Sequence, residues 1–89
     1  MKRERLEIIK DILKIIQENK NNIRVTPLLR KSNLSSERFY KYLDELTKKE
    51  LIIKKTNKQN NSLLSLTQKG QEFIGKYQAI KNFINEFDL

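Results

Sequence analysis

Four stretches of the chain repeat apolar residues at helical spacing, and two shorter ones are apolar enough for strands. The first stretch predicts a helix from about Arg3 to Asn19, with an apolar stripe of Leu6, Ile9, Ile12, Leu13 and Ile16. Ile8 and Ile15 widen its apolar stripe, which indicates that this helix packs on two sides. NKNN at 19–22 ends the helix, because asparagine tolerates the left-handed conformation. IRV at 23–25 then predicts one short strand.

A short second helix is predicted over TPLLRKSN at 26–33. Thr26 is its expected cap, and Pro27 its first residue, where a missing N–H costs nothing. Ser35 is the expected cap of a third helix over about 36–49. The inward face of that helix carries apolar and aromatic side chains at helical spacing: Phe39, Tyr42, Leu43 and Leu46.

The remaining sequence predicts a hairpin and a long final helix. LIIKK at 51–55 and SLLSL at 62–66 are the strands. Asn60 and Asn61 are the turn residues best able to adopt positive φ. Thr67 caps a helix that runs to about Phe87. Helix, short strand, helix, turn, helix, hairpin and long helix in this order form a winged helix-turn-helix, a mainly α fold with a small β-hairpin (α+β).

The final helix carries a heptad seam over two repeats. Its apolar residues follow a 4-3-4-3 spacing, with Ile74 and Phe83 beside them: Phe73, Tyr77, Ile80, Ile84 and Phe87. Covering the first helix is one use for this surface, and the first half is expected to do so. Beyond Tyr77 little of the domain is left to bury the stripe, which favours a homodimer interface. Gly75 interrupts the helix at a cost of about 1 kcal/mol, and its small size favours a close helix approach.

At 89 residues the chain is a single domain overall, with a limited core that association would stabilise. We expect residues 1–70 to form the winged helix-turn-helix domain and residues 67–89 the C-terminal coiled-coil dimerisation helix.

Composition removes several kinds of chemistry. The chain has no cysteine and no histidine, which excludes disulfides, zinc fingers, thiol nucleophiles and imidazole acid–base catalysis. It also lacks a phosphate-binding glycine loop and paired acids in an apolar setting. We therefore expect no enzyme, no metal and no cofactor. No apolar run is long enough to cross a bilayer or to form a signal peptide, so a cytoplasmic protein without a membrane partner is expected.

The positive charge is concentrated in the middle of the chain. Of the formal net charge of +8, residues 1–22 contribute +2, residues 23–58 contribute +6, and residues 59–89 contribute zero. A general bias of composition towards lysine would spread the excess more evenly. The distribution is typical of an electrostatic footprint for nucleic acid.

The third helix is itself neutral, with four basic and four acidic side chains from Ser35 to Glu50. Its outward positions form two acid-to-base pairs at i,i+4, Glu37 to Lys41 and Asp44 to Lys48. In one interpretation this face is only solvated and the domain binds a protein. In the other, the first turn enters the major groove of DNA, with groove and phosphate contacts from Ser35, Ser36, Arg38, Tyr40 and Lys41. Arg38 is then the candidate for a guanine edge.

The uninterrupted cations lie on either side of that helix. One group precedes or belongs to the second helix: Arg24, Arg30 and Lys31. The other is on the hairpin, where a minor-groove contact is expected at the tip: Lys54, Lys55, Asn57, Lys58 and Gln59. Lysines that merely protect an exposed strand edge are the alternative. The distribution favours backbone binding with strong salt dependence.

NLSSERFYKYLDELTKKELI at 33–52 and SLTQKGQEFIGKYQAIKNFINEF at 65–87 resemble the small archaeal winged-helix DNA-binding proteins. The likeness covers nearly the whole chain and includes the Leu66-Thr67-x-Lys69-Gly70 element. The resemblance implies a dimer held by an antiparallel coiled coil of the C-terminal helices. One departure is Glu50, where that family usually has glycine in a left-handed turn; a non-glycine residue there costs up to about 1 kcal/mol, or the turn takes another path.

These features together favour a dimeric, double-stranded DNA-binding protein that is nucleoid-associated and acts in transcription regulation or chromosome organisation. The alternative is a winged-helix protein-protein interaction module of a transcription assembly, which the neutral face of the third helix favours. Binding of single-stranded RNA is disfavoured, because the sequence offers no exposed aromatic platform for stacking bases.

Overall fold

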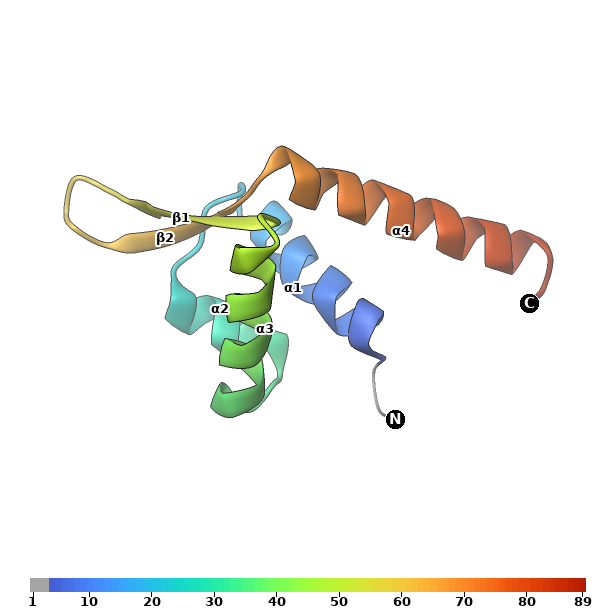
Figure 1. Cartoon of the computed structure of the whole chain (residues 1–89), viewed down its shortest axis with the longest axis horizontal. Coiled ribbons are helices and arrows are strands. Elements are labelled where there is room, and N and C mark those ends of the chain that lie inside the picture. The colour runs from blue at the N-terminus through green and yellow to red at the C-terminus, as the bar shows by residue number, and fades with distance from the viewer. Residues whose placement is uncertain (1–3) are drawn as a thin grey trace.

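The structure is a computed structural model of the chain that describes residues 4–89, so the predicted helix start at Arg3 lies outside the described residues. Three helices come first, α1 (Arg5–Glu18), α2 (Val25–Ser32) and α3 (Ser36–Lys48). An antiparallel hairpin of β1 (Ile52–Thr56) and β2 (Ser62–Leu66) follows, and the chain ends in α4 (Gln68–Glu86). The hairpin projects on one side and α4 on the other (Figure 1). The predicted winged helix-turn-helix fold is confirmed.

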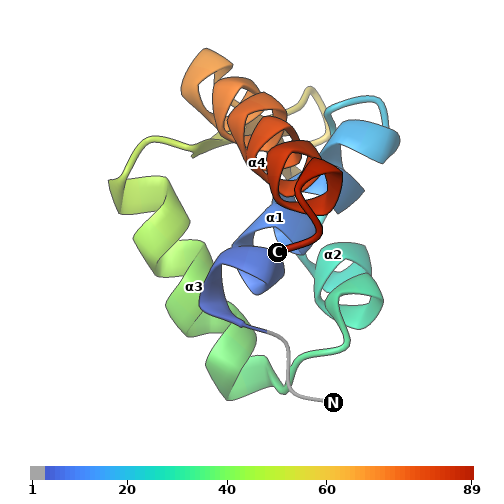
Figure 2. The same ribbon diagram turned by 90° about the vertical axis from the view of Figure 1, so that its right-hand side faces the viewer.

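The core lies around α1. Five isoleucine and leucine side chains of this helix are at most 5% exposed: Ile8, Ile9, Ile12, Leu13 and Ile16. Leu28 of α2, Phe39 and Leu46 of α3, and Leu64 of β2 join them in one apolar cluster. Figure 2 shows α1 between α2 and α3, with α4 lying across it. Because α1 is covered from several sides, its apolar stripe is wider than that of a surface helix.

The segment between α1 and α2 differs from the predicted strand and cap. At 23–25 only Ile23 pairs, through two backbone hydrogen bonds to Leu64 of 3.1 and 2.7 Å. Arg24 is extended and acts as the N-cap of α2, and its carbonyl accepts from the N–H of Leu28. Thr26 is therefore not the cap but lies in the first turn. Pro27 is the third helical residue, a position whose N–H has no intrahelical acceptor either.

The end of α3 explains how Glu50 replaces the expected glycine. Glu50 has a φ of 61° and is left-handed. Its N–H donates to Thr47 and the N–H of Leu51 donates to Leu46, at 3.0 and 2.9 Å. This pair of bonds is a Schellman motif, which satisfies the last carbonyls of the helix. The turn keeps the path usual for glycine, and β1 consequently begins at Ile52 rather than at Leu51 as predicted.

The hairpin is joined to the body by its base. Ile52 pairs with Leu66 there, and both are buried. Asn21, from the loop after α1, accepts a 2.6 Å hydrogen bond from the N–H of Leu66 through its side-chain oxygen. The asparagine side chain thus accepts a hydrogen bond from the backbone of β2 that the backbone of a neighbouring strand would otherwise accept. Among the predicted turn residues, Asn60 adopts positive φ, at 66°.

Thr67 joins the end of α3 to the start of α4. Its hydroxyl accepts from the N–H of Gly70 at 3.0 Å, which confirms the predicted cap, and donates to the carbonyl of Glu50 at 2.6 Å. Lys69 Nζ reaches the carbonyl of Lys49 at 3.1 Å. A Cβ at Gly70 would collide with the carbonyl of Leu51. A glycine is therefore needed here for close packing rather than for its backbone freedom.

Candidate nucleic-acid interface

Helix α3 presents its outer face to solvent. Ser35 caps it by accepting from the N–H of Arg38 at 3.3 Å, as predicted. Phe39 and Leu46 are buried beneath it. The two predicted pairs are present, Glu37–Lys41 at 3.6 Å and Asp44–Lys48 at 3.0 Å, and all four side chains are at least 65% exposed. Such exposed pairs contribute little stability, so they leave this face close to neutral without holding it rigidly.

The two flanks of α3 differ in chemistry. On the hairpin side, Tyr40, Asp44 and Thr47 line an open hollow of about 540 Å³. Lys54 and Leu64 of the hairpin line its other side. The Tyr40 ring is held edge-on against Phe39, with centroids 5.3 Å apart. On the α1 side, a second hollow of about 410 Å³ contains Arg38 and Lys41. Hence Arg38 and Tyr40, predicted to act together, lie on opposite flanks of the helix.

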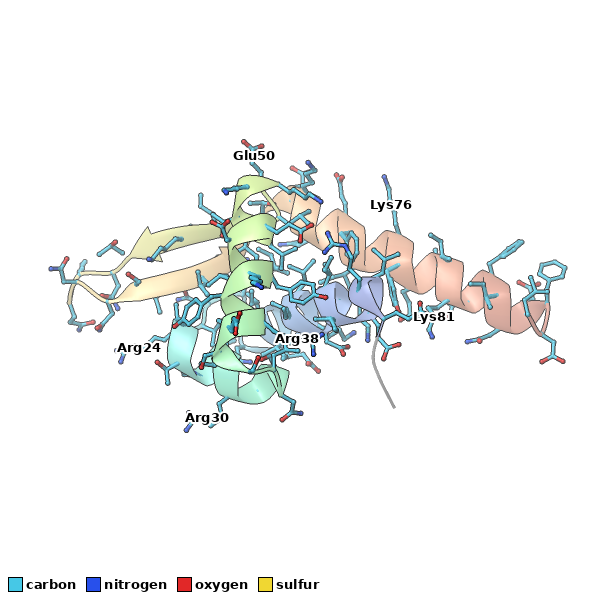
Figure 3. All side chains as sticks on the ribbon, turned by 60° about the horizontal axis from the view of Figure 1, so that its bottom comes forward. Arg24, Arg30, Arg38, Glu50, Lys76 and Lys81 are labelled. Atoms are coloured by element: carbon cyan, nitrogen blue, oxygen red, sulfur yellow. The ribbon has the colours of Figure 1, made fainter. Side chains whose placement is uncertain are left out.

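Of the remaining predicted residues, Ser36 is the exposed first residue of α3. The cations of α2 and its cap lie on the surface of the domain. Arg24, Arg30 and Lys31 are all exposed. Figure 3 places Arg24 and Arg30 on the α2 side of α3, away from Arg38. Lys31 Nζ donates to the side-chain oxygen of Asn19 at 3.2 Å, which ties it to the end of α1.

The hairpin lysines do not form a single cluster. Lys54 and Lys55 are consecutive on β1, so their side chains leave opposite faces of the strand pair. Lys54 faces the hollow beside α3. Lys55 lines a different hollow, of about 380 Å³, together with Lys20 and Asn21 of the loop after α1. Lys20 was not among the predicted contacts, because only the folded hairpin brings it beside Lys55.

The tip of the hairpin is shaped by Asn57. Its side-chain oxygen accepts from the N–H groups of Gln59 and Asn61, at 3.0 and 2.9 Å. That oxygen is therefore committed to the turn. Lys58 and Gln59 are exposed at the tip and remain the residues placed to contact a ligand there.

Arg5 is a further cation beside α3 that the sequence interpretation missed. Its guanidinium is paired with Glu45 and lies 5.9 Å from the centre of the Tyr42 ring. Both partners belong to α3, 37 or more residues away along the chain. Local sequence patterns carry no signal for such a contact, since it depends on how α1 crosses α3.

The seam on α4 divides into two parts. Phe73 and Tyr77 stack with ring centroids 6.3 Å apart and are partly buried. Further along, Ile80, Phe83 and Phe87 are 60%, 56% and 59% exposed. The rings of Phe83 and Phe87 lie 4.9 Å apart, so they form one continuous apolar surface. Ile84 between them is half-buried.

Residues 4–89 contain no group of three or more acidic side chains arranged to hold a metal ion. Within the same residues, none of the helices has the length and apolar character needed to span a bilayer.

Comparison with known proteins supports the fold assignment. The crystal structure of Sso10a-2, a DNA-binding protein from Sulfolobus solfataricus, matches with a TM-score of 0.74 at 24% identity, over 97% of this chain and 87% of that one. A transcriptional regulator of the MarR family from Silicibacter pomeroyi matches with a TM-score of 0.66 at 17% identity, over 90% of this chain and 56% of that one. A search of curated protein sequences found no match.

At these identities the two structures show a shared fold. The sequence also identifies the family, because the model of the winged helix-turn-helix family matches residues 2–85, nearly the full length. The chain belongs to the winged helix-turn-helix family.

Proposed function

We propose that this protein binds double-stranded DNA as a homodimer and acts in transcription regulation or in organising the chromosome in the nucleoid. The observation that carries the proposal is the position of the charge. Cations from α2, its cap and the hairpin lie along the same flank of the exposed helix α3, namely Arg24, Arg30 (Figure 3) and Lys54. Segment 23–58, which contains all three, holds +6 of the +8 net charge.

The neutral outer face of α3 indicates what kind of DNA binding to expect. Glu37 and Asp44 on that face would repel phosphates, while the cations around the helix attract them. Binding through the backbone then supplies most of the affinity, and base contacts add a modest preference. Such behaviour suits an architectural protein as well as a regulator. The Sulfolobus structure, described as a DNA-binding protein, supports the DNA partner.

Dimerisation is proposed from the distal part of α4. Its apolar surface around Phe83 and Phe87 is more than half exposed, and it is continuous. Exposed patches of this kind mark association sites. A second copy of α4, packed along the same seam, would cover it and join two α3 helices in one molecule.

The test is fluorescence anisotropy of a labelled random-sequence duplex at several salt concentrations. We expect binding with a steep negative slope of log affinity against log salt. Replacing Lys54, Lys55 and Lys58 with alanine should reduce that slope by about 3 for each protomer that contacts the duplex, because each phosphate that a lysine neutralises accounts for about 0.9. A matched control removes the same charge from exposed lysines elsewhere, Lys14, Lys76 and Lys81; the last two lie on α4 (Figure 3).

An equal reduction of the slope in both triple variants would mean that only net charge matters, which contradicts a hairpin contact. The protein-interaction alternative rests on the salt-paired outer face of α3. Absence of duplex binding at low salt, together with capture of an acidic protein partner, would favour it over DNA binding.

A further inference from the structure

Three cations from two helices surround one hollow on the α1 flank of α3. Arg5 comes from the first turn of α1, and Arg38 and Lys41 come from α3. The hollow has a volume of about 410 Å³ and also contains Tyr42 and Glu45. In Figure 3 Arg38 lies on this side of α3, while Arg24 and Arg30 lie on the α2 side. Sequence position alone gave no reason to group Arg5 with the other two.

Arg5 is held in place and still has donors to offer. Its guanidinium pairs with Glu45 and lies over the ring of Tyr42, at 5.9 Å from the ring centre. Even so, its side chain is 53% exposed. A guanidinium has five N–H donors in a fixed plane, and one carboxylate oxygen engages only part of them. A further anion therefore meets a cation that is already oriented, which lowers the entropic cost of binding.

The hollow keeps a net positive charge in spite of Glu45. That carboxylate is shared, because Lys49 Nζ also donates to it at 2.8 Å. Lys41 is paired with Glu37 at 3.6 Å, but both side chains are more than three-quarters exposed, so the pair is weak and easily exchanged. Arg38 takes part in none of the ion pairs found among residues 4–89. The local charges thus favour an anion.

The size of the DNA major groove indicates which anion. An α-helix with its side chains is about 10–12 Å wide and the groove about 12 Å, so a helix inside it lies between two rows of phosphates. On one flank of α3 the cations come from α2 and the hairpin. On the other flank they come from Arg5, Arg38 and Lys41.

We propose that Arg5, Arg38 and Lys41 form a binding site for backbone phosphate of the DNA strand on the α1 flank of α3. This proposal rests on the proposed function and adds the second strand to it. Arg38, which the sequence suggested as a reader of guanine, contacts phosphate in this arrangement. Glu45 orients Arg5 and does not touch DNA.

The test compares Arg5→Ala with the unaltered protein in the same salt titration, using a random-sequence duplex. Removing one phosphate-binding cation should lower affinity on every duplex and reduce the slope by about 1 for each protomer that contacts it. The triple variant of Arg5, Arg38 and Lys41 to alanine should reduce the slope by about 3 for each such protomer. Lys14→Ala is the matched control, because Lys14 is an exposed cation nine residues further along α1, on its opposite side.

The slope separates a phosphate contact from a purely structural role of Arg5. If Arg5 only positions α3, Arg5→Ala lowers affinity and melting temperature without changing the slope, and the phosphate site is refuted. Arg5→Lys keeps the charge and should restore the slope. Should Arg5→Ala fail to fold, Arg38→Ala, at an exposed position, carries the same expectation.

Failure of this site is distinguishable from failure of the proposed function. Unchanged slopes in Arg5→Ala and Arg38→Ala, with steep slopes in the unaltered protein, would overturn the phosphate site and leave DNA binding intact. Absence of binding by the unaltered protein would overturn both.

Discussion

The two halves of α4 carry the same apolar seam but end in different surroundings. In the proximal half, Ile74 is 8% exposed and Tyr77 packs towards α1, with Lys10 Nζ 5.7 Å from its ring centre. In the distal half, Ile80 and Phe83 are more than half exposed. The spacing of apolar residues therefore predicts an apolar face, while the rest of the fold decides what covers it. The proximal half is covered within the chain, whereas the distal half stays exposed and is the surface that we propose for dimerisation.

The two glycines of α4, both in its proximal half, also differ in their surroundings. Gly70 is buried, and a Cβ placed there would meet the carbonyl of Leu51. Around Gly75, no atom of residues 4–89 outside its own helix lies within 4 Å of a Cβ placed there. Gly75 is also two positions after Phe73, on the side of the helix opposite the seam. The predicted close helix approach at Gly75 is thus absent from this chain and does not point towards the proposed interface.

The largest effect on the folding stability of a single chain is expected at Gly70. In Gly70→Ala the new methyl group overlaps the Leu51 carbonyl, so the start of α4 and the turn after α3 must move apart. Overpacking of this kind typically lowers the free energy of unfolding by about 1–3 kcal/mol, and we expect about 2 kcal/mol. Chemical denaturation followed by circular dichroism measures it.

Gly75→Ala is the control within the same helix. Without a clash, the better helix propensity of alanine should raise the free energy of unfolding by up to about 1 kcal/mol. Two glycines of one helix would then respond in opposite directions. Equal destabilisation by both substitutions would contradict the difference in packing around the two glycines.

A second substitution tests the distal half. Replacing Ile80 and Ile84 with glutamate should give a monomer, because each buried isoleucine contributes about 1.5–3 kcal/mol and a buried, unpaired carboxylate opposes association. Analytical ultracentrifugation measures the mass. The control places glutamate at Asn82 and Asn85, on the other side of the same stretch of α4. A dimeric mass for the isoleucine variant would refute the seam.

The smallest effect is expected at Lys10, in the proximal contact. Its hydrogen bond to Asp11, at 2.7 Å, raises the pKa of Lys10 above the ordinary 10.5, with smaller contributions from Tyr77 and Glu7. Because the folded pKa is the higher one, the stabilisation is complete below pH 10.5 and is lost as the pH rises through the folded pKa.

Lys10→Met keeps the aliphatic stem and removes the charge. Its free energy of unfolding should be lower than that of the unaltered protein by less than about 1 kcal/mol at neutral pH. The difference should disappear at strongly alkaline pH. A difference that persists there would assign the effect to packing against Tyr77 instead of charge.

Local signals in the sequence predicted most of the fold. The caps at Ser35 and Thr67 are confirmed, because a hydroxyl before an apolar repeat has one dominant local use. The strand at 23–25 is wrong beyond Ile23, since an isolated pairing with Leu64 leaves no mark on local periodicity. The start of α2 was placed too late, because Pro27 fits several positions in a first helical turn equally well.

The candidate site was less predictable, because it depends on how elements cross. Helical spacing brings out the two ion pairs of α3, but only packing shows that Arg38 faces α1 and Tyr40 faces the hairpin. For Lys54 and Lys55 the sequence was sufficient, because consecutive residues of a strand point to opposite faces of the sheet. The place of Arg5 at the site could not be predicted from the sequence, since its partner Glu45 is 40 residues away along the chain.

The junction between α3 and α4 is held by the hydroxyl of Thr67. It connects the last turn of α3 with the first turn of α4, and Gly70 brings the two so close that little sliding is possible. We therefore expect α3 and α4 to keep a fixed relative orientation. If two copies join along α4, this junction sets the distance between their two α3 helices. It thereby sets the spacing of the two DNA segments that one dimer contacts.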